Sequence, residues 1–276
     1  MLTDISVVIP TFRRPGPLNE AVRSALAQDG ARVDVLVLDD SPEGSGHDVV
    51  AAIADPRVTY RHRAKPSGGN PSLVRNEGWP EARGQLVHFL DDDDRVAPFA
   101  YREVLDTFSK HPDRGVVFGR IEPFGDDPAA VERERRVFER SARRSRFLQR
   151  LGCLGGRLSL AGLVAGQLFC NPTAFVNSAC IIRREHIAAL GGYDEQLKLM
   201  EDVDFFTRAI RAFGFVFLDR VLVQYRTGAP SLMNDVAEQN DVSSVYQAMY
   251  VRYSGEHGMA ELLGLKLMGK AVVRWM

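Results

Sequence analysis

Four consecutive aspartates, Asp91 to Asp94, follow directly after the apolar segment LVHFL. Neighbouring carboxylates repel one another, so the run lowers stability unless a cation or hydrogen-bond donors absorb the charge. Hard divalent cations prefer carboxylate oxygens, and Mg²⁺ usually takes one or two carboxylates together with substrate phosphates. Side chains two apart in an extended segment share a face, so Asp91 with Asp93, or Asp92 with Asp94, can converge on one ion. A solvated acidic turn is the alternative interpretation.

A second pair of carboxylates, Asp39 and Asp40, follows another apolar segment and leads into a turn. An ionised carboxylate only accepts hydrogen bonds, so at a ligand-binding edge it suits the N–H groups of a nucleobase or the hydroxyls of a ribose. Asp-Asp-Ser-Pro is also ordinary turn chemistry. Both interpretations stay open.

The segment SGGNPSLVRNEG places two glycines ahead of a helical stretch that carries Arg75. Gly68 and Gly69 allow the backbone to approach a ligand closely. A guanidinium pairs well with a phosphate or with neighbouring carboxylates. Arg75 therefore suits either a ligand contact or a structural brace for the acid run.

Glu201 and Asp202 stand at the start of an amphipathic helical pattern, MEDVDFFTRAIRAFG. Acidic residues at a helix N-terminus complement the helix dipole, which is a purely structural role. A carboxylate beside a metal site can also act as a general base towards a hydroxyl nucleophile. The sequence gives these two roles equal weight.

The elements that must position these residues alternate along the first half of the chain. Apolar segments followed by helical patterns predict right-handed βαβ units, hence an α/β fold with a mostly parallel sheet flanked by helices. Ligands bind such sheets at the carboxyl ends of the strands, where all the acidic sites of this half are expected. The predicted strands are 6–10, 33–40, 57–63 and 86–90, and the predicted helices are 17–28, 47–54 and 72–82.

The alternation breaks near residue 119. A turn-rich stretch precedes a helical pattern with a strong arginine excess over 131–150, which we expect to form a basic, mobile excursion. Over 177–226, two apolar strands bracket two helical segments.

The last segment, 259–276, carries Lys266, Lys270 and Arg274 at a spacing of four among apolar residues. On a helix these cations form one stripe against a broad apolar surface. One interpretation is packing on the chain's own domain or on a second copy in a homodimer. The other is peripheral contact with an anionic membrane at its cytoplasmic face.

Composition excludes several classes. The 276 residues have a formal net charge of −1, so the chain as a whole has no electrostatic footprint for nucleic acid. The N-terminus does not have the pattern of a signal peptide, and the apolar stretch 158–166 is too short to cross a bilayer. Three widely spaced cysteines predict a reducing cytoplasm. The sequence has no phosphate-loop, GxGxxG or GxSxG motif, which removes the commonest NTPase, dinucleotide and serine-hydrolase interpretations.

Six motifs in order along residues 4–226 resemble the family 2 glycosyltransferases, which have the GT-A fold, a Rossmann-like α/β sheet. The motifs are SVVIPTFRRP, VLVLDDSPEG, GGNPSLVRNEG, VHFLDDDDRVAP, GGYDEQL and MEDVDFFTRA. The resemblance implies a glycosyltransferase domain at 1–228, with a nucleotide-binding half at 1–118 and an acceptor-binding half at 119–228. It also implies a helical C-terminal extension at 229–276.

The same resemblance implies a chemistry and a cofactor. The donor is expected to be a nucleotide-diphosphate sugar, with UDP as the expected nucleotide. The acceptor is expected to be a hydroxyl on a saccharide, a lipid-linked compound or a small molecule, which attacks the anomeric carbon of the donor sugar with inversion. Mn²⁺ or Mg²⁺ is the expected cofactor.

Individual residues take roles from the resemblance. Asp93 is expected to bind the metal ion, with Asp91 as a second ligand, and Asp91 or Asp92 is expected near the ribose. Asp202 is expected to be the catalytic base, next to Glu201. Contacts to the nucleotide are expected at Pro10, Thr11, Arg13, Asp39, Asp40, Gly69, Arg75, Asp91 and Asp92.

The motifs depart from the family in three places. Four aspartates in a row leave the metal-binding position ambiguous by one residue, and SPEG follows the paired acids where glycine often stands. The Gln-x-x-Arg-Trp motif of processive members is absent, which argues against a polysaccharide synthase. Two alternatives from other classes remain: a non-catalytic nucleotide-sugar-binding protein, and a sugar nucleotidyltransferase that releases pyrophosphate.

Overall fold

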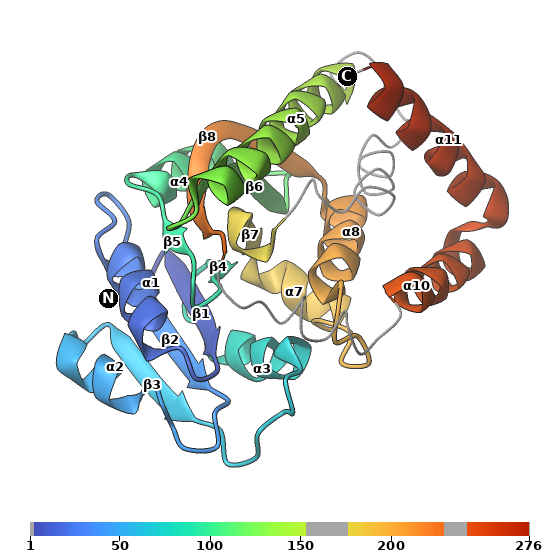
Figure 1. Cartoon of the computed structure of the whole chain (residues 1–276). Helices are drawn as coiled ribbons and strands as arrows, with labels where there is room; N and C mark the ends of the chain where they lie inside the picture. The colour runs from blue at the N-terminus through green and yellow to red at the C-terminus, as the bar shows by residue number, and fades with distance from the viewer. Residues whose placement is uncertain (1–2, 153–175, 229–241, 276) are drawn as a thin grey trace.

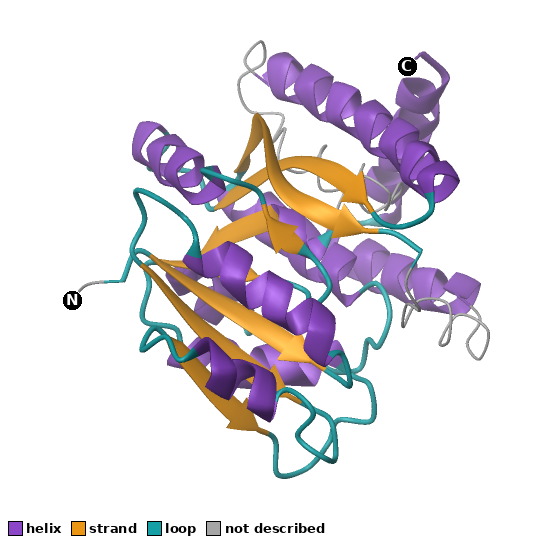
Figure 2. Cartoon of the chain, turned by 60° about the vertical axis from the view of Figure 1, so that its left-hand side comes forward, coloured by secondary structure: helices purple, strands orange, loops and turns teal. Residues whose placement is uncertain are grey.

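The computed structural model describes residues 3–152, 176–228 and 242–275. The apolar stretch 158–166 lies outside these residues. Helices cover both faces of one central sheet (Figures 1 and 2). The predicted α/β fold is therefore confirmed.

The sheet follows the order β3-β2-β1-β4-β7-β6-β8-β5. Among the described residues, four of its seven strand pairings are parallel and three are antiparallel. The parallel pairings include all contacts among the first four strands, as predicted. The strands are β1 (Ile5–Thr11), β2 (Val33–Asp39), β3 (Val58–His62), β4 (Leu86–Phe89), β5 (Arg95–Val96), β6 (Val116–Phe124), β7 (Cys180–Arg183) and β8 (Phe215–Arg226).

Strand β1 lies in the middle of the N-terminal half and is buried on both faces. Ile5, Val7 and Ile9 pack in one apolar core with the first helices, whereas Val8 packs in the core on the opposite face. This burial explains the continuous apolar segment, which is typical of a central parallel strand. The helices are α1 (Pro15–Leu26), α2 (His47–Ile53), α3 (Pro71–Gly78), α4 (Ala100–Lys110), α5 (Pro128–Gly152), α7 (Arg184–Leu190), α8 (Glu201–Phe213), α10 (Val242–His257) and α11 (Met259–Trp275), with 3-10 turns at Trp79–Glu81 and Asn177–Ala179.

The two cores divide the helices between the faces of the sheet. One core holds apolar side chains of α1, α2 and α4, and the other holds side chains of α3, α7 and α8. The carboxyl ends of β1, β2 and β4 come together between these layers, because β1 pairs in parallel with both neighbours.

The middle of the chain differs from the prediction in one part and agrees in the next. Ile121 to Phe124 belong to β6 rather than to a turn-rich stretch. The helix predicted over 131–150 is confirmed, since 128–152 form one continuous helix, α5, whereas the mobility of this basic segment stays a prediction. The helix packs on the protein through Ala142 in the core and through the ring of Phe138, whose centroid lies 5.5 Å from that of Tyr225.

The C-terminal helices α10 and α11 pack against the start of α8. Met249, Tyr253, Leu262 and Leu265 form a small core with Val203. Among the described residues, no helix combines the length and apolar character needed to cross a membrane.

Candidate active site

The four consecutive aspartates, Asp91 to Asp94, are called the acid run. The acid run contacts the end of β1. The side chain of Thr11, at the end of β1, donates a hydrogen bond to Oδ2 of Asp92 (2.7 Å). The backbone N–H of Asp40 donates to the carbonyl oxygen of Thr11 (2.9 Å). Thr11 therefore contacts both acidic sites, and the structure brings together two sites that the sequence placed at separate strand ends.

The four aspartates form a turn, in which the backbone N–H of Asp94 donates to the carbonyl oxygen of Asp91 (3.2 Å). The prediction of an extended segment is therefore wrong, although the predicted alternation is present, because Asp91 and Asp93 are partly exposed and Asp92 and Asp94 are buried. A fully solvated turn is also wrong, because Asp92 and Asp94 are buried. Asp92 and Asp93 instead share one cation, since Nη1 of Arg14 lies 3.3 Å from Asp92 Oδ1 and 2.6 Å from Asp93 Oδ2.

Arg75 connects the acid run to the start of α8. Its Nη2 donates to Asp91 Oδ1 (2.8 Å), and its Nη1 donates to Glu201 Oε1 (2.7 Å). The guanidinium is buried and also lies 5.4 Å from the ring centroid of Tyr193. Burial lowers the pKa of Arg75, but Asp91 and Glu201 more than compensate and raise it above its ordinary value. The structural brace proposed for Arg75 is thus present.

Asp202 follows Glu201 and is partly exposed, with Oδ1 accepting from the backbone N–H of Val203 (2.8 Å). Burial and, after it, the neighbouring Glu201 raise the pKa of Asp202 to about 7 against the opposing effect of Arg75. A carboxylate with a pKa near 7 is well matched to general-base catalysis at neutral pH. The residue before the pair, Met200, has a φ of 59°, in the left-handed region. Strained backbone of this kind concentrates at functional sites.

The other end of the acid run is fixed by β8. The backbone N–H of Arg226 donates to Asp94 Oδ1 (3.0 Å), and its Nε donates to the carbonyl oxygen of Asp93 (2.9 Å). Burial raises the pKa of Asp93 and Asp94, and nearby members of the acid run raise it further. Burial followed by Asp93 also raises the pKa of Asp92 to about 7.

The carboxylate oxygens of the acid run are suitable ligands for a divalent cation. Burial is the main cause of the raised pKa values of Asp92 and Asp93, and neighbouring carboxylates add to it although Arg14 opposes them, so a nearby cation would favour the ionised forms. Asp91 and Asp93 keep 33% and 20% of their side chains exposed, whereas Asp92 and Asp94 are enclosed. No group of three metal-ligating side chains occurs among the described residues. Two carboxylates with the remaining ligands from substrate phosphates are sufficient for Mg²⁺.

Asp39 and Asp40 are both buried; Asp39 ends β2 and Asp40 begins the loop that follows. Asp39 accepts hydrogen bonds from the backbone N–H groups of Ser41 (2.9 Å) and Gly46 (2.7 Å) and from the hydroxyl of Tyr60 (2.9 Å). Its carboxylate therefore fixes the shape of the loop. A contact between Asp39 and a nucleotide stays a prediction.

Asp40 pairs with the buried guanidinium of Arg63 and accepts from the N–H (2.7 Å) and hydroxyl (2.6 Å) of Ser67. These bonds tie the loop after β2 to the glycine-containing segment ahead of α3. Gly69, in that segment, has a φ of 80°, which a side chain would strain. The roles of Asp40 and Gly69 in nucleotide binding stay predictions.

Two of the predicted nucleotide contacts, Pro10 and Arg13, lie at the edge of the candidate site. Pro10 is half-buried within β1. Arg13 has a φ of 56° and turns outward to an exposed ion pair with Glu43 (2.8 Å). The side chain of Arg13 is thus paired away from the acid run.

Four residues of the site were not predicted from the sequence: Arg14, Asn177, Tyr193 and Arg226. Asn177 donates to Phe89 O (2.9 Å) and accepts from the hydroxyl of Tyr193 (2.8 Å), so both stand beside the acid run and Arg75. The second arginine of TFRRP was a visible signal for Arg14. The other three come from distant segments, and their proximity depends on the tertiary fold.

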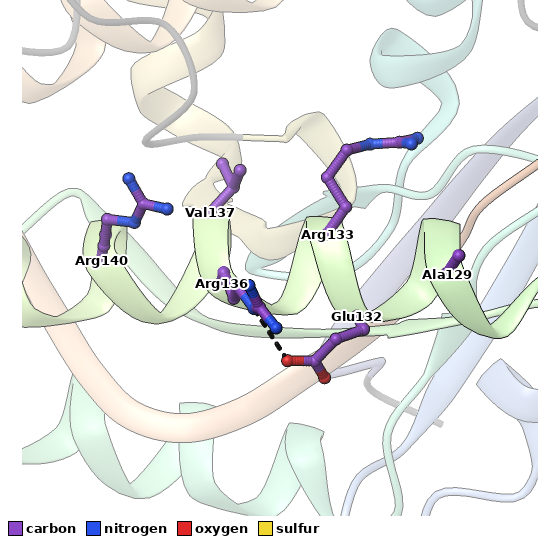
Figure 3. A pocket seen from close by; sticks show the side chains of 6 residues that line it. All are labelled: Ala129, Glu132, Arg133, Arg136, Val137 and Arg140. Atoms are coloured by element: carbon purple, nitrogen blue, oxygen red, sulfur yellow. Dashed lines mark hydrogen bonds and ion pairs between the residues drawn. The ribbon is translucent and has the colours of Figure 1, made fainter.

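A groove of about 430 Å³ lies apart from these residues, along α5 (Figure 3). Arg133, Val137 and Arg140 point to one side of the helix, and Arg136 pairs with Glu132 (3.0 Å). The groove is lined by none of the predicted site residues.

The sheet, the carboxylates at its strand ends and the brace to α8 together define a GT-A type α/β protein. Residues 6–160 match the family model described as glycosyl transferase family 2. Because this match covers more than half of the sequence, the chain belongs to glycosyl transferase family 2.

Individual relatives agree with this assignment. The succinoglycan biosynthesis protein ExoO of Rhizobium meliloti is 37% identical over 103 residues, which are 37% of this chain and 29% of that protein. A structure of S. aureus TarS with UDP-GlcNAc is similar with a TM-score of 0.58 and 18% identity, over 84% of this chain and 60% of that chain. The mannosyltransferase PcManGT of Pyrobaculum calidifontis with GDP-Man and Mn²⁺ gives a TM-score of 0.62 and 14% identity, over 99% and 75%. These two structures support the fold.

Proposed function

We propose that this chain transfers a sugar from a nucleotide-diphosphate donor to an acceptor hydroxyl, with inversion at the anomeric carbon and with help from a divalent cation. The observation that carries the proposal is the brace from Asp91 through Arg75 to Glu201. It holds an acidic edge suited to a metal–diphosphate next to Asp202, a carboxylate whose pKa is raised to about 7. The groups proposed to assist departure of the diphosphate and the group proposed to activate the acceptor hydroxyl would thus act at one site.

The donor would bind along the ends of β1, β2 and β4. Asp40 and the loop it anchors offer acceptors for the base, and Asp92 or Asp91 offers acceptors for the ribose. Asp91 and Asp93 would hold Mn²⁺ or Mg²⁺, which supplies a Lewis acid that neutralises charge on the leaving diphosphate. UDP is the expected nucleotide, in keeping with the UDP-GlcNAc bound by the structural neighbour TarS.

Asp202 would act on the acceptor. Its ionised carboxylate accepts the proton of the acceptor hydroxyl as the hydroxyl oxygen attacks the anomeric carbon. The bond from that carbon to the diphosphate oxygen breaks, and its electron pair leaves with the nucleoside diphosphate. Attack from the face opposite the leaving group inverts the configuration. Glu201 stays paired with Arg75 and keeps the start of α8 in position.

A screen of nucleotide sugars with the full chain tests the proposal. The chain is incubated with UDP-, GDP- and dTDP-sugars in Mn²⁺ or EDTA, and released nucleoside diphosphate is measured with and without saccharide acceptors. Mn²⁺-dependent release that Asp202→Asn abolishes supports the proposal. Release of pyrophosphate from a sugar phosphate and a nucleoside triphosphate would instead show a nucleotidyltransferase. Tight donor binding without any turnover would show a non-catalytic binding protein.

A further inference from the structure

Helix α11 presents an exposed apolar face. Met259, Leu263 and Leu267 are 57%, 53% and 69% exposed and recur at every fourth residue. Leu262 and Leu265 on the other side are buried in the small core with α10. The helix therefore packs on the protein with one side and leaves a second apolar side outward among the described residues.

Cations lie within the same outward arc. At 100° per residue, position 270 falls between positions 259 and 263 around the helix, and position 266 falls just beside them. Lys270 is exposed, and Lys266 lies over the ring of Tyr250, 3.7 Å from its centroid. Apolar and cationic side chains thus alternate on one face instead of occupying separate faces.

A second basic element points to the same end of the molecule. The C-terminal ends of α5 and α11 both lie at the upper end of the molecule in two views turned about the vertical axis (Figures 1 and 2). Helix α5 carries eight arginines against three glutamates, although the whole chain has a net charge of −1. Phe147 near its end is 42% exposed, and Arg143 and Arg140 beside it are exposed. Exposed cations and apolar groups therefore gather on two helices that are far apart in sequence.

We propose that the outward face of α11, helped by the exposed arginines in the C-terminal half of α5, docks on an anionic lipid bilayer. Interfacial helices bury leucine and phenylalanine side chains at the level of the headgroups, while lysine and arginine contact anionic lipids. The interleaving of Lys270 with Leu263 and Leu267 matches that arrangement.

Charge disfavours a second copy of the chain as the occupant. A two-fold symmetric contact places the same patch of both copies together, so the arginines of α5 and the lysines of α11 would meet like charges. An anionic surface neutralises them. The inference rests on residues outside the acid run and stands independently of the proposed function.

Vesicle co-sedimentation of the full chain tests the docking. Phosphatidylglycerol–phosphatidylcholine vesicles are compared with pure phosphatidylcholine vesicles at low and high salt, using the original chain, Leu263→Gln/Leu267→Gln and Arg140→Gln/Arg143→Gln. The control is Val251→Gln, which changes an apolar residue of α10 that is 66% exposed. Circular dichroism confirms that each variant is folded, as the exposed positions lead us to expect.

The original chain and Val251→Gln should sediment with anionic vesicles at low salt. Each double variant should bind these vesicles with an affinity about tenfold lower, a change of ~1.4 kcal/mol. Binding should fall on pure phosphatidylcholine and at high salt. Equal binding of folded Leu263→Gln/Leu267→Gln, or no binding of the original chain to anionic vesicles, overturns the proposal. A dimer in solution that the same double variant dissociates, without vesicle binding, assigns this face to a second copy instead.

Discussion

Nη2 of Arg75 lies 2.8 Å from Oδ1 of Asp91, sixteen positions further along the chain. The same guanidinium reaches Glu201 on α8 with its other terminal nitrogen. One buried cation thus holds the acid run and the helix of the proposed base at a fixed separation. Their relative position is therefore set by contacts within the fold.

Removing this cation should destabilise the protein strongly. Arg75→Met leaves Glu201 buried without its partner, and loss of one member of a buried ion pair typically costs about 3–5 kcal/mol. We expect a decrease of that size in the free energy of unfolding, measured by urea titration at pH 7.5. Arg61→Gln, which breaks the exposed pair of Arg61 with Glu81, is the control and should have little effect. Equal stability of the two variants would contradict a structural role for the brace.

The activity should depend on pH through Asp202. Its pKa is raised to about 7, so the proton-accepting form is lost as pH falls below 7. We expect kcat/KM for sugar transfer to decrease about tenfold per pH unit on the acidic side. Asp202→Asn should lose turnover at every pH, and its remaining rate should lack this acidic limb. A pH profile of the original enzyme that is flat between pH 5.5 and 8 would argue against Asp202 as the base.

The same variant should be more stable than the original chain at high pH. A carboxyl group whose pKa is raised by folding favours the folded state when protonated, so its ionisation lowers stability as pH rises from about 4 through 7. Asp202→Asn removes that loss. After a reduction for solvent screening, we expect the free energy of unfolding to rise by about 1–2 kcal/mol at pH 8 and by roughly a third of that at pH 5. Urea unfolding at both pH values in EDTA measures the difference.

The N-terminal half was predictable because its signals are local. Buried parallel strands such as Ile5–Thr11 need near-continuous apolar segments, and their polar residues then fall at the strand ends. Strand β6 was missed because Pro123 and Gly125 are typical of turns. Pro123 lies beyond the three residues of β6 that pair with β7, where β8 is the neighbouring strand among the described residues, and proline in sheets is confined to such edge positions.

Side-chain directions within the site could not be predicted. TFRRP offers two adjacent arginines, and only the left-handed backbone of Arg13 turns that side chain towards Glu43 and leaves Arg14 on the acid run. The four aspartates likewise diverge because they form a turn. Contacts such as Asn177 with Tyr193 depend on how distant segments pack, which local spacing does not encode.

Asp39 should prove essential for the loop after β2. Asp39→Asn replaces a carboxylate oxygen with an NH₂ group among the donors Ser41 N, Gly46 N and Tyr60 Oη. A buried donor facing donors costs about 1–3 kcal/mol, and thermal or urea unfolding should show that loss. Asp48→Asn, on the exposed start of α2, should differ little from the original chain. If the two variants are equally stable, Asp39 is free to face a ligand instead.

Arg14 should compete with the divalent cation for Asp93. Its Nη1 lies 2.6 Å from Asp93 Oδ2, so an ion that binds this carboxylate must displace or share the guanidinium. Arg14→Gln removes the competing charge, and we expect Mn²⁺ alone to bind about three- to tenfold more tightly, a change of ~0.7–1.4 kcal/mol. Nucleoside diphosphate affinity should decrease in the same variant, because a released guanidinium pairs well with phosphate.

Titration calorimetry separates these two effects, first with Mn²⁺ and then with UDP in the presence of Mn²⁺. Arg57→Gln is the control, since Arg57 pairs with Asp55 (2.8 Å) ahead of β3, outside the predicted site, and its loss should leave both affinities unchanged. Weaker Mn²⁺ binding in Arg14→Gln would mean that Arg14 organises the carboxylates for the ion rather than competing with it. Because Thr11 and Arg14 both reach Asp92, the first strand and its following turn would then set the metal site as a unit.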